Sequence, residues 1–155
     1  MKLSTKEDVE APIATVFGML SDFEMFERSA IRRGAEVHRV GEHEAPEVGL
    51  AWEASFSMRG KERSARVELT QYTPPSDMVF ESRSSGLITL LEIELMPLSP
   101  RRTRVAVSAQ FKPSTLPARL FVQSMKLAKS NLSKRFKLRV ADYAKDIEDR
   151  ASRIA

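Results

Sequence analysis

The sequence predicts an α+β fold: a seven-stranded antiparallel sheet packed against a long C-terminal helix, with two short helices after the first strand. Changes of periodicity support this assignment. Apolar residues recur at helical spacing in residues 12–26, alternate with polar residues from 34 to 112, and return to helical spacing from 115 onward. The 155 residues are enough for one domain and too few for two of ordinary size, so we expect a single domain over residues 1–155.

The N-terminal segment is expected to form a strand followed by two short helices. Leu3 and Val9 share one parity of an alternating run, and Pro12 then opens a helix because proline is tolerated in a first helical turn. Ser21 and Glu24 match a capping box, so a second helix is expected to begin at Ser21. The apolar positions of this region follow helical spacing: Val16, Phe17, Leu20, Phe23 and Phe26.

Six further strands are expected between residues 34 and 112, where apolar and polar residues alternate and turn residues interrupt the runs. We place these strands at residues 35–40, 52–58, 65–69, 78–84, 91–95 and 104–111. Turns are expected at Gly60-Lys61, Thr73–Ser76 and Pro97–Pro100. Such alternation is typical of an antiparallel sheet with one face in water.

A single apolar stripe predicts a C-terminal helix over about residues 115–150. The stripe comprises Phe121, Val122, Met125, Ala128, Leu132, Phe136, Val140, Tyr143 and Ile147. As one straight helix this segment would measure about 54 Å, whereas a compact chain of this length has a diameter of roughly 40 Å. The helix is therefore expected either to overhang the body or to bend.

The net charge of +4 conceals an uneven distribution along the chain. Residues 1–100 hold 11 Lys and Arg against 17 Asp and Glu, whereas residues 101–155 hold 14 against 4. No acidic residue occurs between Glu94 and Asp142. A basic tract suggests nucleic acid, an anionic membrane or a solvated face. Nucleic acid is not favoured because no recognition motif is present, and we interpret the charge mainly as balance between the two halves of one body.

Several classes of site are excluded or disfavoured by composition. The chain has no cysteine, so disulfides and thiolate metal sites are absent. His38 and His43 are the two histidines, and with Glu42, Glu44 and Glu47 they make a weak metal-ligand set, so no metal is predicted. No glycine-rich phosphate loop or nucleophile elbow occurs, and no cofactor is predicted. Without an apolar signal segment or membrane span, the expected location is cytoplasmic.

The N-terminal segment also carries a family resemblance. Residues 9–23 match Val-x-Ala-Pro-x-x-x-Val-Phe-x-x-Leu-Ser-Asp-Phe, which resembles the first strand and helix pair of the SRPBCC superfamily, the START and birch-pollen-allergen-like group that includes polyketide cyclases and dehydrases. The order of elements is similar to the helix-grip fold of that superfamily over essentially the whole chain. The resemblance implies a curved antiparallel sheet wrapped around the last helix, with a hydrophobic cavity between them. Ligands in such families are lipids, sterols, quinones, polyketides or other apolar molecules.

The predicted function is non-covalent binding, or transport, of an apolar small molecule or lipid in that cavity. The candidate lining residues lie on the inward parity of the strands or on the helix stripe: Trp52, Phe56, Leu69, Gln71, Leu91, Val107, Phe121, Met125, Leu132 and Phe136. Ordinary core packing would use the same residues. Lys129 and Arg139, near the edges of the helix stripe, are candidates for holding an anionic head group at the mouth of the cavity, although snorkelling into solvent is the simpler role.

Two alternative functions are consistent with the same fold. A cyclase or dehydratase needs only a shaped pocket and one acid–base group, such as Tyr72, His38 or a neighbour of Gln71, and such a group leaves no motif. A protein-interaction module, like the co-chaperone branch of the superfamily, is expected to have a packed interior without a cavity.

A second set of leucines on the C-terminal helix lies roughly opposite the apolar stripe and beside lysines. These residues are Leu116, Leu120, Leu127 and Leu138. Three roles are consistent with them: packing on the short N-terminal helices, forming a homodimer, or contacting an anionic membrane surface peripherally.

Overall fold

One antiparallel sheet of seven strands, in the order β1-β7-β6-β5-β4-β3-β2, forms the frame of the molecule. The structure is a computed structural model that describes residues 1–154. The strands are β1 (Lys2–Val9), β2 (Glu36–Val40), β3 (Ala51–Met58), β4 (Lys61–Thr73), β5 (Asp77–Ser84), β6 (Leu87–Ser99) and β7 (Arg102–Pro113). The helices are α1 (Ile13–Leu20), α2 (Phe23–Arg32), α3 (Leu116–Leu127) and α4 (Lys129–Ile154). The predicted order of elements is confirmed.

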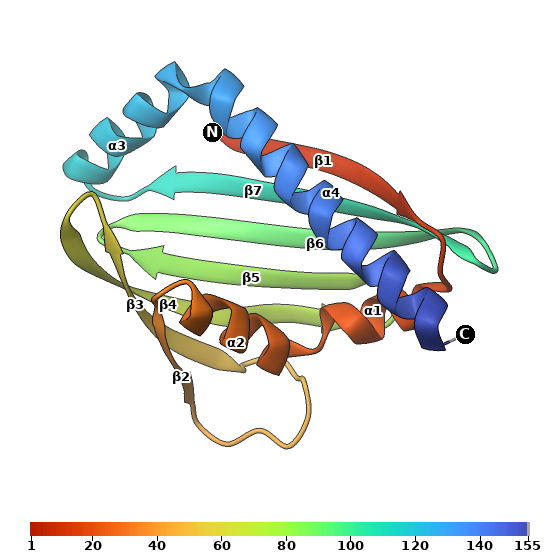
Figure 1. The fold of residues 1–155 in the computed structure, drawn as a ribbon. Helices are drawn as coiled ribbons and strands as arrows, with labels where there is room; N and C mark the ends of the chain where they lie inside the picture. Colours follow the sequence, from red (N-terminus) through yellow and green to blue (C-terminus); the bar gives the residue numbers. More distant parts are fainter. Residues whose placement is uncertain (155) are drawn as a thin grey trace.

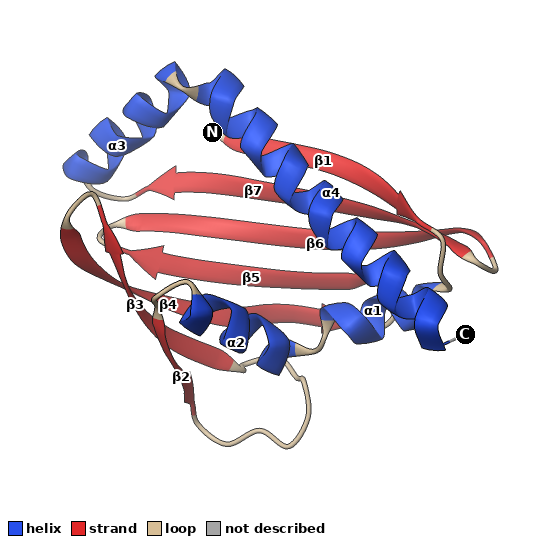
Figure 2. Cartoon of the chain, viewed as in Figure 1, coloured by secondary structure: helices blue, strands red, loops and turns tan. Residues whose placement is uncertain are grey.

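The sheet curves around its helices, which all lie on one of its faces (Figure 1). Helix α4 crosses the β1 side of the sheet diagonally, and α1 and α2 cover the other side (Figure 2). The opposite face of the sheet carries polar side chains such as Glu53 and Arg66, which are exposed. The α+β architecture predicted from the periodicity is therefore confirmed, and so is the helix-grip fold that the family resemblance implied.

The core lies between the sheet and the helices at the α1 end of the molecule. Val9, Val16, Leu69 and Met78 have no exposed surface, and burying each large side chain contributes about 1.5–3 kcal/mol. From α4 the core receives mainly small residues, Ala144, Ile147 and Ala151. Because these residues recur at three- and four-residue steps, one face of α4 can approach β1 closely.

The C-terminal segment bends rather than continuing as one helix. Helix α3 begins after Thr115, whose side chain accepts a hydrogen bond from the Ala118 N–H at 3.3 Å, and it ends before Ala128. Helix α4 begins at Lys129 and runs in a different direction (Figure 1). Of the two alternatives left by the length of the segment, the structure shows the bend.

One local prediction at the N-terminal helices is wrong. Asp22, not Ser21, caps α2, because the Asp22 side chain accepts a hydrogen bond from the Met25 N–H at 3.4 Å. Ser21 instead ends α1, where its hydroxyl donates to the Phe17 carbonyl at 2.8 Å and accepts from the Tyr72 hydroxyl at 2.8 Å. Aspartate and serine are equally good caps, so the adjacent aspartate replaces the serine once Tyr72 engages its hydroxyl.

The predicted turn at residues 97–100 is also shorter than expected. Strand β6 continues through Pro97 to Ser99, and its pairing with β7 shifts register between these two residues. A proline lacks the N–H that a regular ladder uses, and an irregularity of this kind accommodates it.

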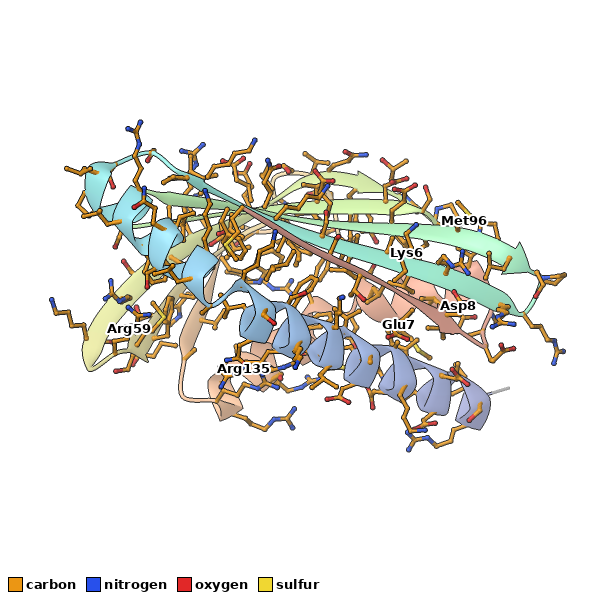
Figure 3. All side chains as sticks on the ribbon, turned by 90° about the horizontal axis from the view of Figure 1, so that it is seen from above. Lys6, Glu7, Asp8, Arg59, Met96 and Arg135 are labelled. Carbon is orange, nitrogen blue, oxygen red and sulfur yellow. The ribbon has the colours of Figure 1, made fainter. Side chains whose placement is uncertain are left out.

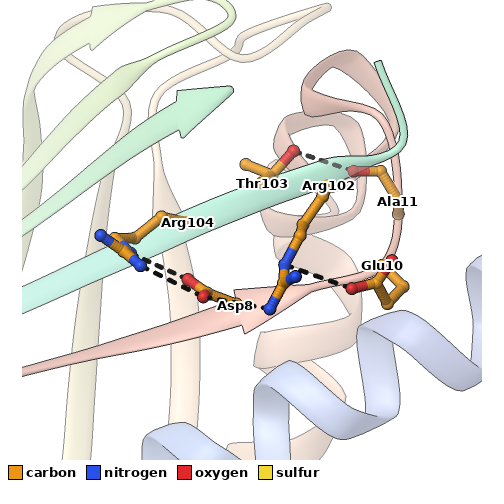
Figure 4. Close-up of polar contacts among 6 residues, drawn as sticks. All are labelled: Asp8, Glu10, Ala11, Arg102, Thr103 and Arg104. Carbon is orange, nitrogen blue, oxygen red and sulfur yellow. Dashed lines mark hydrogen bonds and ion pairs between the residues drawn. The ribbon is translucent and has the colours of Figure 1, made fainter. Parts of the chain in front are cut away.

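Charged residues connect the N-terminal strand β1 to the last strand, β7. Arg104 Nε lies 2.9 Å from Asp8 Oδ1, and Arg102 lies 3.5 Å from Asp8 and 3.2 Å from Glu10 (Figure 4). The Thr103 hydroxyl donates to the Ala11 carbonyl at 2.8 Å in the same region. The hydrogen bond from Arg104, with the nearby positive charges, holds the pKa of Asp8 below its usual value. This is a direct instance of the predicted balance between the acidic and basic parts of the chain.

Membrane-spanning helices are absent from the described residues 1–154, since none of the helices there combines the necessary length with the necessary apolarity.

Candidate functional site

A cavity of about 460 Å³ lies between helices α1 and α2 and strands β2 to β6. Its walls are mostly apolar, and the few polar side chains among them are Glu27, Ser82 and Thr89. The lining residues are Leu20, Phe23, Phe26, Glu27, Ala30, Val37, Trp52, Ala54, Val67, Phe80, Ser82, Thr89, Leu91 and Ile93. The cavity therefore lies beside the short N-terminal helices, whereas the family resemblance implied a cavity between the sheet and the C-terminal helix.

The floor of the cavity follows directly from the register of the sheet. Trp52 is paired with Val67, Val67 with Ser82, and Ser82 with Thr89, so these four side chains form one row across β3 to β6. Directly paired side chains on one face are about 4.5–5.5 Å apart. The row contains two small polar residues at its centre and end, and these leave space above the sheet that larger residues would fill.

Three aromatic rings form one end of the cavity. Phe23 of α2 meets Trp52 edge-on at 5.4 Å and Phe80 edge-on at 5.7 Å between ring centroids. Trp52 and Phe80 are 6.2 Å apart. Edge-to-face pairs of this kind add about 0.5–1.5 kcal/mol each beyond the burial of their surface. The wall is therefore rigid, because rings from a helix and two strands hold one another.

Glu27 is the charged residue in the cavity wall. It lies one helical turn after Phe23 on α2, and its Oε1 accepts a hydrogen bond from the Trp52 indole N–H at 2.7 Å. The same oxygen accepts from Arg39 Nε of the edge strand β2. Hydrogen bonds to an ionised acceptor are stronger than neutral ones. Glu27 thus fixes the Trp52 ring and connects α2 to β2 and β3.

Two of the ten predicted lining residues, Trp52 and Leu91, line this cavity. Leu69 is fully buried in the core, and Val107 packs against that core. Phe56 is half-buried on β3, beyond the cavity wall. The inward direction expected for Trp52, Leu69 and Leu91 is correct, but the interior is filled at Leu69 and empty beside the other two.

The inward direction expected for Gln71 is wrong. Strand β4 has a bulge between Leu69 and Gln71, where the pairing with β5 skips one residue. The extra residue reverses the alternation, so Gln71 is exposed and Tyr72 points inward, 5.3 Å from the Phe17 ring between centroids. A bulge of this kind leaves no clear signal in the local sequence.

The predicted residues of the C-terminal segment lie outside the cavity wall. Phe121 and Met125 on α3, and Leu132 and Phe136 on α4, are half-buried. Lys129 is exposed, and Arg139 lines a separate hollow of about 570 Å³ between α2 and α4, together with Arg32 and Arg33. Phe26 lines both this hollow and the cavity. Of the two cations considered for a head group, Arg139 is therefore the one near the cavity.

The acid–base candidates suggested by the sequence also lie elsewhere. The Tyr72 hydroxyl donates to Ser21, and His38 is exposed on the edge strand β2. His43 Nδ1 lies 2.6 Å from Glu47 Oε1 in the loop after β2. Within residues 1–154, no group of three or more His, Asp or Glu side chains is arranged to hold a metal ion.

Sequence reasoning missed the helical wall of the cavity. Phe23, Phe26, Glu27 and Ala30 occupy positions i, i+3, i+4 and i+7 of α2, which is the spacing of one helix face. An acidic residue on an otherwise apolar helix face was the sequence signal that could have identified Glu27 as part of the cavity wall. The spacing of the two phenylalanines served to locate the helices but not the cavity.

Comparisons with known structures bear on the fold. A protein from Thermus thermophilus superposes with a TM-score of 0.66 and 14% identity, covering 100% of this chain and 99% of the other. A START superfamily protein from Mycobacterium smegmatis gives 0.63 and 14%, covering 99% of both chains. The chain has the START-like helix-grip fold. The START-like fold is also found in the ZhuI aromatase/cyclase from Streptomyces sp. R1128, with a TM-score of 0.63, 15% identity, and coverage of 99% of this chain and 94% of the enzyme.

The resemblance inferred from residues 9–23 is thus supported at the level of the START-like fold. The three superpositions include almost the whole of this chain. No family model matches the chain, and no curated protein matches it.

Proposed function

We propose that the protein binds an apolar small molecule or lipid non-covalently in the cavity between α1, α2 and the sheet. The observation that carries the proposal is a cavity of about 460 Å³ whose wall is apolar apart from three side chains. Small-molecule sites typically occupy about 300–1,000 Å³, are mostly apolar and contain a few polar groups that orient the ligand. Here Glu27, Ser82 and Thr89 provide those groups.

The rigidity of the aromatic wall supports the same proposal. Phe23, Trp52 and Phe80 hold one another, and Glu27 holds the Trp52 ring. A preformed site loses little conformational entropy when a ligand enters, so more of the contact energy appears as affinity. The ligand is expected to place an apolar ring or chain against Trp52 and a hydrogen-bond donor near Glu27.

Native mass spectrometry of freshly purified protein is the first test, and it is expected to show a retained apolar molecule. The second test is a titration with the dye anilinonaphthalene sulfonate, followed by its fluorescence. Thr89→Phe fills the cavity from the floor and is expected to weaken dye binding by about tenfold or more, which corresponds to roughly 1.4 kcal/mol. Leu90→Phe is the matched control, because Leu90 is the next residue of β6 and points to the opposite face.

The two variants separate binding in the cavity from binding elsewhere. Both add an aromatic ring to the same strand, so a general loss of stability would affect both titrations. Equal dye affinity for Thr89→Phe and the unmodified protein would contradict the proposal, as would the absence of any dye binding by the folded protein.

A second candidate function, cyclase or dehydratase chemistry, is favoured by one observation, the carboxylate of Glu27 in the cavity wall. In a dehydration, this carboxylate would remove a proton from the carbon next to a carbonyl and return a proton to the departing hydroxyl, which leaves as water. Incubation with a β-hydroxy ketone and mass detection of water loss tests it. Glu27→Gln is expected to abolish the reaction and to retain dye binding, whereas unchanged turnover excludes Glu27 as the acid–base group.

The cavity counts against the interaction-module alternative, since that alternative was expected to have a packed interior.

A further inference from the structure

Helix α3 exposes three leucines to solvent, whereas its Phe121 and Met125 are half-buried. The side chains that it buries are small, Ala118 and Val122, whereas Leu116, Leu120 and Leu127 are 68%, 58% and 92% exposed. These three leucines are called the leucine ridge. An ordinary amphipathic helix carries polar residues on its solvent-facing side. Packing of the leucine ridge on the short N-terminal helices, one role suggested by the sequence, is excluded by this exposure.

The leucine ridge is narrow and has cations on both sides. At 100° per residue, Leu116, Leu120 and Leu127 fall within an arc of about 40° opposite the buried side of α3. Arg119 and Lys126 lie on one flank of this arc. On the other flank the Arg59 guanidinium lies over the Phe121 ring, 5.4 Å from its centroid.

The chain segment that contains the leucine ridge carries no acidic residue. Residues 95–141 include no Asp or Glu. Among the ion pairs of the described residues 1–154, none involves a basic residue of α3 or of the first half of α4, which holds Lys129, Lys134, Arg135 and Lys137. The intramolecular balance seen at Asp8 therefore does not extend to this end of the molecule.

The charges beside the leucine ridge distinguish among three possible partners: a second copy of the chain, nucleic acid and an anionic membrane. In a symmetric dimer through the leucine ridge, Arg119 and Lys126 of two copies would face each other without any acidic residue of α3 to pair with them. Nucleic acid would match the charge but would leave three exposed leucines against phosphates. An anionic bilayer matches both features, because it offers acyl chains to leucines and phosphates to cations.

We propose that α3 docks the protein on an anionic membrane surface, with the leucine ridge inserted between the lipid head groups and Arg119 and Lys126 against the lipid phosphates. The bend at Ala128 supports this contact, because it directs α3 away from the line of α4 and leaves the helix at one end of the molecule (Figure 1). No residue of α3 lines the cavity, so docking is independent of the proposed ligand binding.

The test is co-sedimentation of the full chain with vesicles of phosphatidylcholine, with and without phosphatidylglycerol. Binding is expected only with the anionic lipid, and it is expected to disappear near 1 M salt, where the Debye length is about 3 Å. Arg119→Glu/Lys126→Glu is expected to lower partitioning about 25-fold or more, since each positive charge near such a surface contributes about fivefold.

A matched pair of triple variants isolates the leucines. Leu116→Gln/Leu120→Gln/Leu127→Gln removes the leucine ridge, and Met96→Gln/Leu98→Gln/Ile154→Gln removes three other exposed apolar residues. Figure 3 shows Met96 at the end of the molecule opposite Arg59 and α3. The first variant is expected to lose vesicle binding, and the second is expected to keep it. Circular dichroism checks that both remain folded, and dye binding in the absence of vesicles is expected to be unchanged in both.

A fluorescence measurement gives a readout that does not depend on loss of function. Leu127→Trp in a Trp52→Phe background places the single tryptophan on the leucine ridge. Its emission is expected to shift to the blue when anionic vesicles are added. An unshifted emission, or equal partitioning of the two triple variants, would overturn the proposal. A dimer in sedimentation equilibrium that the leucine variant dissociates would overturn it in favour of a second copy.

Discussion

The hydrogen bond between Trp52 and Glu27 offers a direct test of how the cavity wall is held. The Trp52 indole N–H donates to Glu27 Oε1 at 2.7 Å, and Trp52 is only 7% exposed. Glu27→Leu removes the acceptor and leaves the buried N–H without a partner, which costs about 1–3 kcal/mol. Arg39 is partly exposed and can be solvated by water, so the loss of its ion pair with Glu27 adds little to the cost of this substitution. We expect the free energy of unfolding to fall by about 2 kcal/mol.

Urea denaturation followed by tryptophan fluorescence measures this change, because Trp52 is the only tryptophan. With a urea dependence of about 2 kcal/mol per molar, a loss of about 2 kcal/mol lowers the midpoint by roughly 1 M. Glu27→Gln keeps a carbonyl oxygen for the indole and loses the charge, so its midpoint is expected to lie between those of Glu27→Leu and the unmodified protein.

Glu53→Leu is the matched control for this experiment. Glu53 follows Trp52 in the chain, but its side chain is exposed and its ion pair with Arg66, at 3.6 Å, is also exposed. Exposed pairs contribute about 0–1 kcal/mol, so the control is expected to change the midpoint little. A midpoint of Glu27→Leu equal to that of the unmodified protein would refute the assignment of a structural hydrogen bond, and equal losses in both variants would show that any lost carboxylate has this effect.

Two further predictions concern the ends of the sheet. Asp8→Asn is expected to lower the urea midpoint at pH 7 because it removes the carboxylate that Arg104 stabilises. Since the folded-state pKa of Asp8 is lowered, this contribution is complete above about pH 4 and is lost as the pH falls through the folded-state pKa, so the two midpoints are expected to converge in acid. Gly86→Ala is expected to cost about 1–3 kcal/mol in the same assay, because Gly86 has a φ of +80° and a Cβ there would collide with the Thr115 side chain. Equal slopes of midpoint against pH for Asp8→Asn and the unmodified protein, or an unchanged midpoint for Gly86→Ala, would contradict these predictions.

Most of the fold could be predicted because alternation along a strand reports which side chains face the helices. Trp52, Leu69 and Leu91 were placed inward from alternation alone, and each is buried or lines the cavity. Prediction failed where one extra residue interrupts the alternation, as at Gln71, since a bulge changes the parity of everything that follows it in the strand. The bend at Ala128 is similar, because no glycine or proline marks it.

The position of the cavity could not be predicted for a different reason. Periodicity shows which residues face the interior, but the part of the interior that stays empty depends on how all of them pack. Ala144, Ile147 and Ala151 bring α4 close to β1 and close the core there. On the other side, Ala30 of α2 and Thr89 of β6 line the cavity, and both side chains are small. Which small residues come together in one part of the interior depends on the tertiary packing and not on the local sequence.

The bend at Ala128 divides the two apolar patterns of the C-terminal segment, the inward stripe and the opposite line of leucines, between two helices. On a straight helix, Leu138 would continue the line of Leu116, Leu120 and Leu127, and one inward stripe would run along the whole sheet. With the bend, α4 supplies the core through its small residues, while α3 buries only Ala118 and Val122 and exposes its leucines. The cavity and the leucine ridge therefore share no residue, and variants of one are expected to leave the other unchanged. Coupled loss of dye binding and vesicle binding in the leucine variant would mean that α3 contributes to the cavity in solution, and the two proposals would then have to be joined.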